Sequence, residues 1–168
     1  MADEMENAFQ GERSNPLHLQ EVQALLKDID GQLRIKPGHR LFTVLLIDVA
    51  AGLNRRIYSS HPLEYPLGGT KALVRDSEFF QRIVLKGEPR ICVNREECKK
   101  AFFDHERIFS LGCGSAINMP VVWNGVTVGA LNLLDAGGRY SIANTEDVKA
   151  SAAMAVPALL HYLNKEPM

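Results

Sequence analysis

The chain has 168 residues, of which 46% are hydrophobic and 23% are charged, and its formal net charge is −1. This size and composition predict one globular domain whose core needs no disulfide or metal to fold. The near-neutral charge and the lack of a basic run argue against nucleic-acid binding, and no segment approaches the roughly 20 apolar residues that cross a membrane.

The N-terminal region is expected to contain a flexible arm followed by a helix. Residues 1–14 are polar and show no periodicity, so we expect them to form the arm, with residues 15–165 as the single domain. Asn15-Pro16 predicts the helix start, because proline is favoured at the first helical position. Apolar residues recur at helical spacing over 19–33, and Pro37-Gly38 predicts the end of the helix.

Two strands and a loop are expected next. Residues 41–49 are almost continuously apolar, which predicts a strand buried on both faces. Residues 55–60 predict a second short strand with Ile57 and Tyr58 on opposite faces, because side chains alternate along a strand. Residues 61–69 are rich in proline and glycine and predict a loop.

The middle of the chain predicts short helices around an edge strand. Asp76 or Ser77 is expected to cap a helix that holds the apolar residues of 79–85. Residues 89–93 predict a short strand, which the leading proline places at a sheet edge. Residues 96–111 predict one or two short helices.

A β-hairpin is the strongest local prediction. Apolar runs at 121–123 and 126–128 flank Asn124-Gly125, the preferred pair for a type I′ turn. Continuing the two-residue register along both strands places Asn118 and Asn132 on opposite faces. Both faces of the hairpin are largely apolar, so we expect a covering layer on each side.

The last element is expected to be a long helix. It begins at Asn144 or Thr145 and carries an apolar stripe from 148 to 163, and Pro157 is expected to kink it. The predicted order is helix, two strands, helix, strand, helix, hairpin, helix. Because strands and helices do not alternate strictly, this order predicts an α+β fold with an antiparallel sheet.

The element order and several motifs resemble the GAF domain family over about residues 17–163. The most specific motif is the small-x-x-x-x-Pro-Val…Gly-x-x-x-Gly-x-Leu-x-Leu pattern within 115–135. The strand at 41–49 and the Tyr58-containing strand match as well. The Arg-x-Tyr-Ser…Pro-x-x-Tyr-Pro segment from Arg56 to Pro66 is similar to one found in small stand-alone bacterial GAF proteins.

The resemblance implies a six-stranded antiparallel sheet with helices on one face and a pocket of loops and short helices on the other. GAF domains bind cyclic nucleotides, tetrapyrroles, haem or small metabolites, so it implies a sensory or binding module for a small organic ligand. It also implies a homodimer through the first and last helices, with any signal passing through that dimer or an output protein. The expected seam consists of Leu25, Leu26, Leu33, Ala150, Ser151, Ala152 and Ala153.

The candidate ligand-binding residues come from four sources. They are the tyrosine-rich loop segment, an aromatic residue of the middle helix, the Asp104-His105 pair, and the Gly-Cys-Gly stretch together with the buried hairpin strand that follows it. Each residue has an ordinary structural interpretation as well, such as a packed tyrosine, a helix cap or a small buried thiol. The candidates are Tyr58, Ser60, His61, Tyr65, Phe79, Asp104, His105, Cys113, Ser115 and Asn118.

Two other functions stay open at this stage. Cys113 or Cys92 could serve a thiol-dependent redox enzyme similar to the free methionine sulfoxide reductase branch of GAF proteins, although that branch's Val-Cys-Gly segment is absent. Alternatively, the chain could be a dimerisation scaffold without a ligand. The sequence predicts no metal site and no resident cofactor, because it lacks the Cys-His pair of bilin-binding GAF domains and the motif of cyclic-nucleotide ones. Three cysteines without disulfide spacing predict a cytoplasmic protein.

Overall fold

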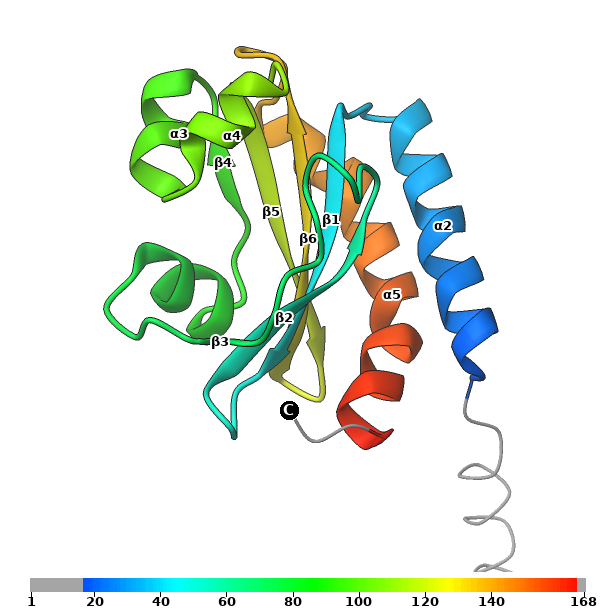
Figure 1. Ribbon diagram of the computed structural model, residues 1–168. Helices are drawn as coiled ribbons and strands as arrows, with labels where there is room; N and C mark the ends of the chain where they lie inside the picture. Colours follow the sequence, from blue (N-terminus) through cyan, green and yellow to red (C-terminus); the bar gives the residue numbers. More distant parts are fainter. Residues whose placement is uncertain (1–16, 166–168) are drawn as a thin grey trace, which may run out of the picture.

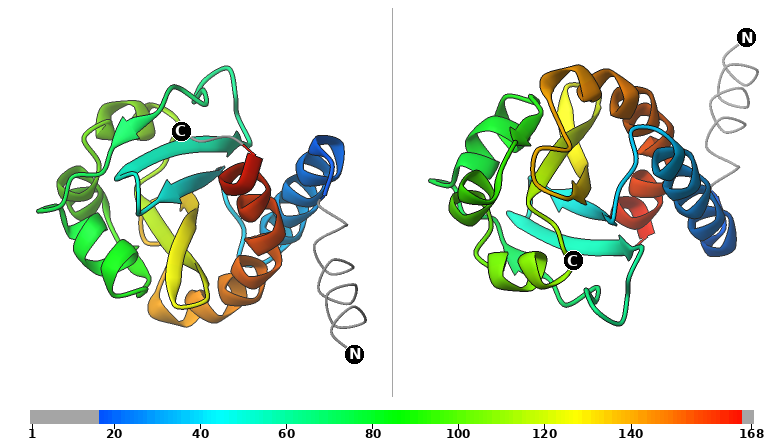
Figure 2. Two further views of the ribbon diagram at one scale, coloured as in Figure 1. Left: turned by 90° about the horizontal axis from the view of Figure 1, so that it is seen from below. Right: turned by 90° about the horizontal axis from the view of Figure 1, so that it is seen from above.

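The computed structural model describes residues 17–165, so the predicted arm at 1–14 and Asn15-Pro16 lie outside the described residues. A six-stranded antiparallel sheet runs in the order β3-β2-β1-β6-β5-β4. Helices α2 and α5 pack on one face, and three short helices stand over the other (Figures 1 and 2). The strands are β1 (Leu41–Asp48), β2 (Leu53–Ser59), β3 (Lys71–Ala72), β4 (Arg90–Cys92), β5 (Ser115–Trp123) and β6 (Val126–Asp135). The helices are α2 (Leu19–Ile35), the π-helix η1 (Phe79–Leu85), α3 (Arg95–Ala101), α4 (His105–Ser110), the 3₁₀ helix η2 (Ile142–Asn144) and α5 (Thr145–Lys165).

Helix α2 begins later than the sequence predicts. Its N-cap is His18 and its first residue is Leu19, so the predicted start at Asn15-Pro16 is wrong. The predicted end is confirmed: the helix stops at Ile35, and Gly38 follows with a φ of 94° that favours glycine. No helix of the described residues is long and apolar enough to cross a membrane.

The main core lies between the sheet and helices α2 and α5. Val22, Leu26, Ile29 and Leu33 of α2 are fully buried at helical spacing. They pack in one cluster with inward-facing residues of the sheet and with the buried stripe of α5. Burial of this apolar area is the main source of stability, at roughly 25 cal/mol for each Å² removed from water.

The opposite face of the sheet carries two smaller apolar clusters. One lies under α3 and α4 and includes Leu134 and Ile108. The other lies under η1 and includes Ile47 and Ala130. We call this face of the sheet the cavity face. Neither of the two apolar clusters covers its middle.

The β5–β6 hairpin contains a β-bulge that was not predicted from the sequence. The predicted Asn124-Gly125 turn is present, and Trp123 pairs with Val126 as expected. The register then shifts between Val121 and Val122, so Asn118 pairs with Asn132 instead of Leu131. The prediction that Asn118 and Asn132 lie on opposite faces is therefore wrong, because one extra residue in a strand reverses the side-chain alternation beyond it.

A second irregularity lies between β1 and β2. Val44 pairs with Tyr58 and Leu45 with Arg56, so Ile57 is an extra residue on β2. Ile57 and Tyr58 consequently both pack against the main core, which corrects their predicted placement on opposite faces. The bulge leaves Arg56 on the cavity face.

Candidate functional site

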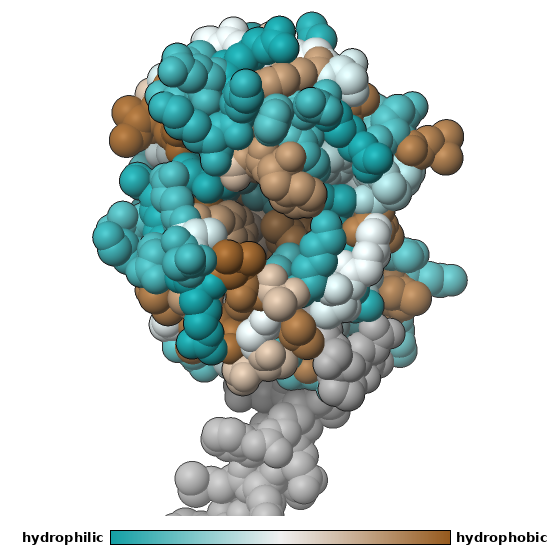
Figure 3. Space-filling model, turned by 60° about the vertical axis from the view of Figure 1, so that its left-hand side comes forward, coloured by the Kyte–Doolittle hydropathy of each residue, from teal (hydrophilic) through white to brown (hydrophobic). Residues whose placement is uncertain are grey.

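A cavity of about 300 Å³ lies between the cavity face of the sheet and the segments that cover it. Figure 3 shows a hollow on this side of the molecule, with apolar residues inside and hydrophilic residues around it. The sides are formed by the Tyr65–Val74 segment, η1 and the α3–α4 connection, and we call this space the sheet cavity. It is lined by strand residues including Thr43, Leu45, Arg56, Arg90, Asn118, Asn132 and Leu134, and by covering residues including Tyr65, Lys71, Phe79, Phe102, Phe103 and Asp104.

A row of four polar residues crosses the floor of the sheet cavity. Arg90 on β4 pairs with Asn118 on β5, which pairs with Asn132 on β6, which pairs with Thr43 on β1. All four are at most 5% exposed. Buried polar groups need hydrogen-bond partners, and these four residues, called the polar row below, are hydrogen-bonded to one another in sequence.

The hydrogen bonds of the polar row all run in one direction. Arg90 Nε donates to Asn118 Oδ1 at 2.9 Å, and Asn118 Nδ2 donates to Asn132 Oδ1 at 2.8 Å. Asn132 Nδ2 then donates to the Thr43 hydroxyl oxygen at 3.2 Å. Because a guanidinium can only donate, Arg90 fixes the orientation of both amides. The Thr43 hydroxyl accepts at the end of the row, so its own hydrogen stays available to a ligand.

Arg90 is held between aromatic rings. Its guanidinium carbon lies 5.7 Å from the ring centroid of Phe79 and 5.3 Å from that of Phe102. Burial lowers the pKa of its guanidinium, while Cys92 and Glu78 oppose this lowering at longer range. Among residues 17–165, no carboxylate lies within ion-pair distance of Arg90, and its two Nη nitrogens have no hydrogen-bond partner.

The Arg56–Pro66 segment closes one side of the sheet cavity. The Arg56 guanidinium stacks 4.1 Å from the Tyr65 ring centroid and donates to the Pro66 carbonyl. The Tyr65 hydroxyl donates to Asp104 at 2.5 Å, which links this segment to the start of α4. Burial, followed by that hydrogen bond, raises the pKa of Tyr65, so its hydroxyl stays protonated as a donor.

The sheet cavity brings together four of the ten predicted ligand-binding residues. Tyr65, Phe79, Asp104 and Asn118 line it, coming from four different parts of the chain. No bound molecule tests their role, which therefore stays a prediction. The other six do not line it: Tyr58, Ser60, His61, His105, Cys113 and Ser115.

The six remaining candidates have other contacts. Ser60 accepts from the Phe42 backbone and contacts His61, which borders a separate, more open cavity beside His39. His105 bonds the Phe102 carbonyl through Nδ1, and the Ser115 hydroxyl donates to the Ala136 carbonyl. These contacts match the ordinary structural interpretations of caps and satisfied buried polar groups.

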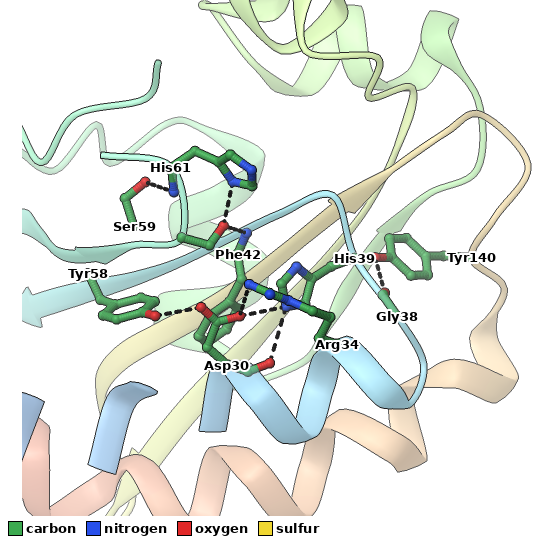
Figure 4. Close-up of polar contacts among 10 residues, drawn as sticks. Asp30, Arg34, Gly38, His39, Phe42, Tyr58, Ser59, His61 and Tyr140 are labelled. Carbon is green, nitrogen blue, oxygen red and sulfur yellow. Dashed lines mark hydrogen bonds and ion pairs between the residues drawn. The ribbon is translucent and has the colours of Figure 1, made fainter. Parts of the chain in front are cut away.

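Tyr58 belongs to a polar cluster on the opposite side of the sheet. Its hydroxyl donates to Asp30 Oδ2 of α2 at 2.5 Å, and His39 Nε2 lies 2.8 Å from Asp30 Oδ1 (Figure 4). Arg34 Nη2 lies 3.7 Å from the same oxygen. This cluster, called the Asp30 cluster below, fastens α2 to β2 and to the loop before β1.

The three cysteines gather in one apolar cluster beside the sheet cavity. Cys92, Cys98 and Cys113 are each at most 3% exposed, and none lines the cavity. Burial, followed by the charge of Asp135, raises the pKa of Cys113 to about 11. A hydrogen bond from Cys98 lowers the pKa of Cys92. Among the described residues, no group of three or more His, Cys, Asp or Glu side chains could hold a metal ion.

Arg90, Thr43 and Asn132 line the site but were not among the residues predicted from the sequence. A signal for two of them was present, because a polar residue within an otherwise apolar strand must be paired. The unpredicted bulge hid the pairing of Asn132 with Asn118. Arg90 lies in a strand of only three residues, where no periodicity shows its direction.

The fold is that of GAF domains of known structure, which confirms the predicted fold. A GAF/HD domain protein from Geobacter sulfurreducens aligns over 90% of this chain and 100% of its own, at 14% identity and a TM-score of 0.66. The GAF domain of a two-component sensor histidine kinase from Bacillus halodurans covers 86% and 97%, at 11% identity and a TM-score of 0.67. A type II free methionine-R-sulfoxide reductase from Thermoplasma acidophilum covers 82% and 92%, at 13% identity and a TM-score of 0.61. No family model and no curated protein sequence matches this chain.

Proposed function

Starting from the GAF fold, we propose that this chain is a sensory module that binds a small organic molecule in the sheet cavity and acts as a homodimer. The observation that carries the proposal is the sheet cavity itself. It lies over buried strands, its floor holds a hydrogen-bonded polar row, and its walls are largely aromatic and apolar. Concave, mostly apolar sites with a few placed polar groups are the usual form of small-molecule sites.

The similar proteins support this proposal at a coarse level. One is the GAF domain of a sensor histidine kinase, which is a signalling protein by its name. In the present chain the sheet lies between α2 and α5 on one side and the short helices on the other (Figure 2), and the cavity is on the side of the short helices. We infer that a signal leaves through these helices, to a second copy of the chain or to an output protein.

Ligand binding is tested by narrowing the sheet cavity. Ala72 on β3 lines the cavity and is exposed, so Ala72→Trp fills space without disturbing the core. The matched control is Ala51→Trp, since Ala51 is an exposed alanine outside the cavity lining. A metabolite library screened by thermal shift should give compounds that stabilise the wild type and Ala51→Trp but not Ala72→Trp. A library without such a compound would contradict the proposal.

The proposed dimer uses the outer surface of α5. Ala150, Ala153, Met154 and Pro157 are exposed at helical spacing and give this surface small, apolar side chains. Four residues of the predicted seam are instead buried within the chain and cannot contact a partner: Leu26, Leu33, Ser151 and Ala152. The proposed seam is thereby reduced to Leu25, Ala150 and Ala153, with Met154 beside them.

A thiol-dependent redox enzyme is the second candidate. One similar structure is a free methionine-R-sulfoxide reductase, and the three cysteines of this chain lie in one cluster. Burial of all three thiols and the raised pKa of Cys113 disfavour this function, because the thiolate is the reactive form, whereas the lowered pKa of Cys92 favours a thiolate at that position. Turnover of free methionine-R-sulfoxide that disappears in Cys92→Ser or Cys113→Ser would establish it instead.

A further inference from the structure

The charges that line the sheet cavity define the chemistry of its ligand. Cationic side chains of Arg56, Lys71 and Arg90 line it, against the single carboxylate of Asp104. That carboxylate already accepts a hydrogen bond from Tyr65. The described lining is therefore cationic, although the whole chain has a formal net charge of −1.

The three cations differ in what they contact. Arg56 stacks on Tyr65 and bonds a backbone carbonyl, and Lys71 lies 5.0 Å over the Phe103 ring at the exposed edge strand β3. Arg90 is only 5% exposed, and a single one of its nitrogens is paired within the described residues. A buried charge is costly unless it is paired and hydrogen-bonded. Arg56 Nε is also buried without a partner, but Arg90 is the most buried of the three side chains and has two unpaired nitrogens, so we take it as the main anion-binding group.

The polar row holds this unpaired charge in place. Asn118 binds Nε, which leaves the outer edge of the guanidinium, with its two Nη nitrogens, for another acceptor. A planar guanidinium fork binds a carboxylate through two parallel hydrogen bonds. Phe79 and Phe102 flank the same group, so apolar ring surface lies next to the point where a carboxylate would bind.

We propose that the ligand of the sheet cavity is a small carboxylate with a flat or branched apolar group, bound by the unpaired Nη edge of Arg90 between Phe79 and Phe102. This inference rests on the proposed function, because it names the class of molecule that the sheet cavity takes. A volume of about 300 Å³ restricts that molecule to the size of a small metabolite.

The test compares carboxylates with amides of the same shape. Benzoate, phenylacetate and 3-methylbutanoate are titrated into the full chain by calorimetry, each beside its neutral amide. At least one carboxylate should bind at least tenfold more tightly than its amide, and Ala72→Trp should abolish this binding. An amide that binds as tightly as its carboxylate in all three pairs overturns the proposal.

Variants of Arg90 test whether its charge recognises the carboxylate of the ligand or whether the side chain only supports the fold. Arg90→Gln should weaken carboxylate binding at least tenfold and remove the preference over the amide. Arg90→Lys should weaken it less and keep the preference, because it retains the charge without the fork. Arg82→Gln is the control, since Arg82 is a nearby exposed arginine whose Nε bonds the Pro89 carbonyl outside the cavity.

The outcomes distinguish this inference from the proposed function. Neutral compounds that bind the wild type but not Ala72→Trp, without any preference for carboxylates, would overturn the anion inference and leave the binding module intact. Failure of every carboxylate, amide and library compound to bind would overturn both. If Arg90→Gln does not fold, the carboxylate-to-amide ratio of the wild type and of Arg90→Lys decides alone.

Discussion

Each side of the sheet has a buried charged side chain, and the two side chains differ in how fully they are paired. On the helix side, the Asp30 carboxylate is surrounded by the donors of Tyr58 and His39 and by the more distant Arg34. On the cavity side, the Arg90 guanidinium has one side-chain acceptor and two flanking rings. The first charge is paired with cationic and hydroxyl groups of the chain and stabilises the fold, although His39 Nδ1 is buried without a hydrogen-bond partner. The pairing of the second charge is incomplete, which is why we assign it to binding.

The Asp30 cluster predicts a pH-dependent stability. Burial alone would raise the pKa of Asp30, but the hydrogen bonds and charges of its partners outweigh burial and lower that pKa. A carboxyl whose pKa is lower in the folded state stabilises the fold above its ordinary pKa, near 4, and loses this contribution as the pH falls. Asp30→Asn should therefore lower the free energy of unfolding by about 2 kcal/mol at pH 7 and by much less at pH 3.

Urea unfolding at both pH values measures this difference. Asp28→Asn is the matched control, because Asp28 is an exposed aspartate of the same helix and should give no change at either pH. A deficit of Asp30→Asn that stays equal at pH 7 and pH 3 would show that the carboxylate charge is not the stabilising element.

Cys113 is predicted to be unreactive in the folded protein. With a pKa of about 11 and 2% exposure, on the order of 0.1% of the thiol is ionised at pH 8. Iodoacetamide at pH 8 should therefore label Cys113 far more slowly in buffer than in 6 M urea, as followed by peptide mass spectrometry. Equal labelling rates would contradict the buried placement and would favour the redox-enzyme candidate.

At the scale of secondary structure, the β5–β6 hairpin shows what sequence patterns can and cannot predict. Asn124-Gly125 between apolar runs predicted the turn and the first pairs, because the turn type depends on two adjacent residues. The bulge could not be predicted, because it depends on contacts from distant segments. Thr127 reaches the Ile83 and Val84 carbonyls of η1 on the cavity side, and the extra residue returns Asn132 to that side.

Substitution by alanine is expected to have opposite effects on stability at two glycines. A Cβ at Gly129 on β6 would lie 2.5 Å from the Leu45 carbonyl oxygen and 2.6 Å from a Leu159 methyl carbon. Gly129→Ala should therefore destabilise the protein by about 1–3 kcal/mol, as overpacking does in other cores. Gly31 of α2 has open space around its Cβ position, so Gly31→Ala should stabilise by about 0.5–1 kcal/mol.

Thermal unfolding of the two variants beside the wild type tests this prediction. The melting temperature should fall for Gly129→Ala and rise for Gly31→Ala. A Gly129→Ala protein as stable as the wild type would mean that α5 does not press on the sheet as closely as described.

At the scale of the whole molecule, the sheet holds the helical core on one side and a partly open layer on the other. The fold was predictable because the long apolar periodicities of α2, β1, β6 and α5 belong to the main core. The site was only partly predictable, because it depends on strand register and on short covering segments such as η1 and β3. Tyr65 and Asp104 were recognisable as candidates, but only folding brings them to Arg90 and Asn132.

The layered architecture also predicts how two copies associate. The exposed surface of α5 presents Ala150, Ala153 and Met154, with Met154 42% exposed. Small side chains allow two helices to approach closely, so this surface should pair with its copy about a two-fold axis.

Sedimentation equilibrium at micromolar concentration should give the dimer mass. Ala153→Glu should shift the chain to the monomer, because two carboxylates would be brought together at the seam. Ala51→Glu, an exposed alanine in the β1–β2 turn, should leave the dimer unchanged. A monomeric wild type would remove the dimer from the proposed function while leaving the sheet cavity in place, and a signal would then have to pass directly to an output protein.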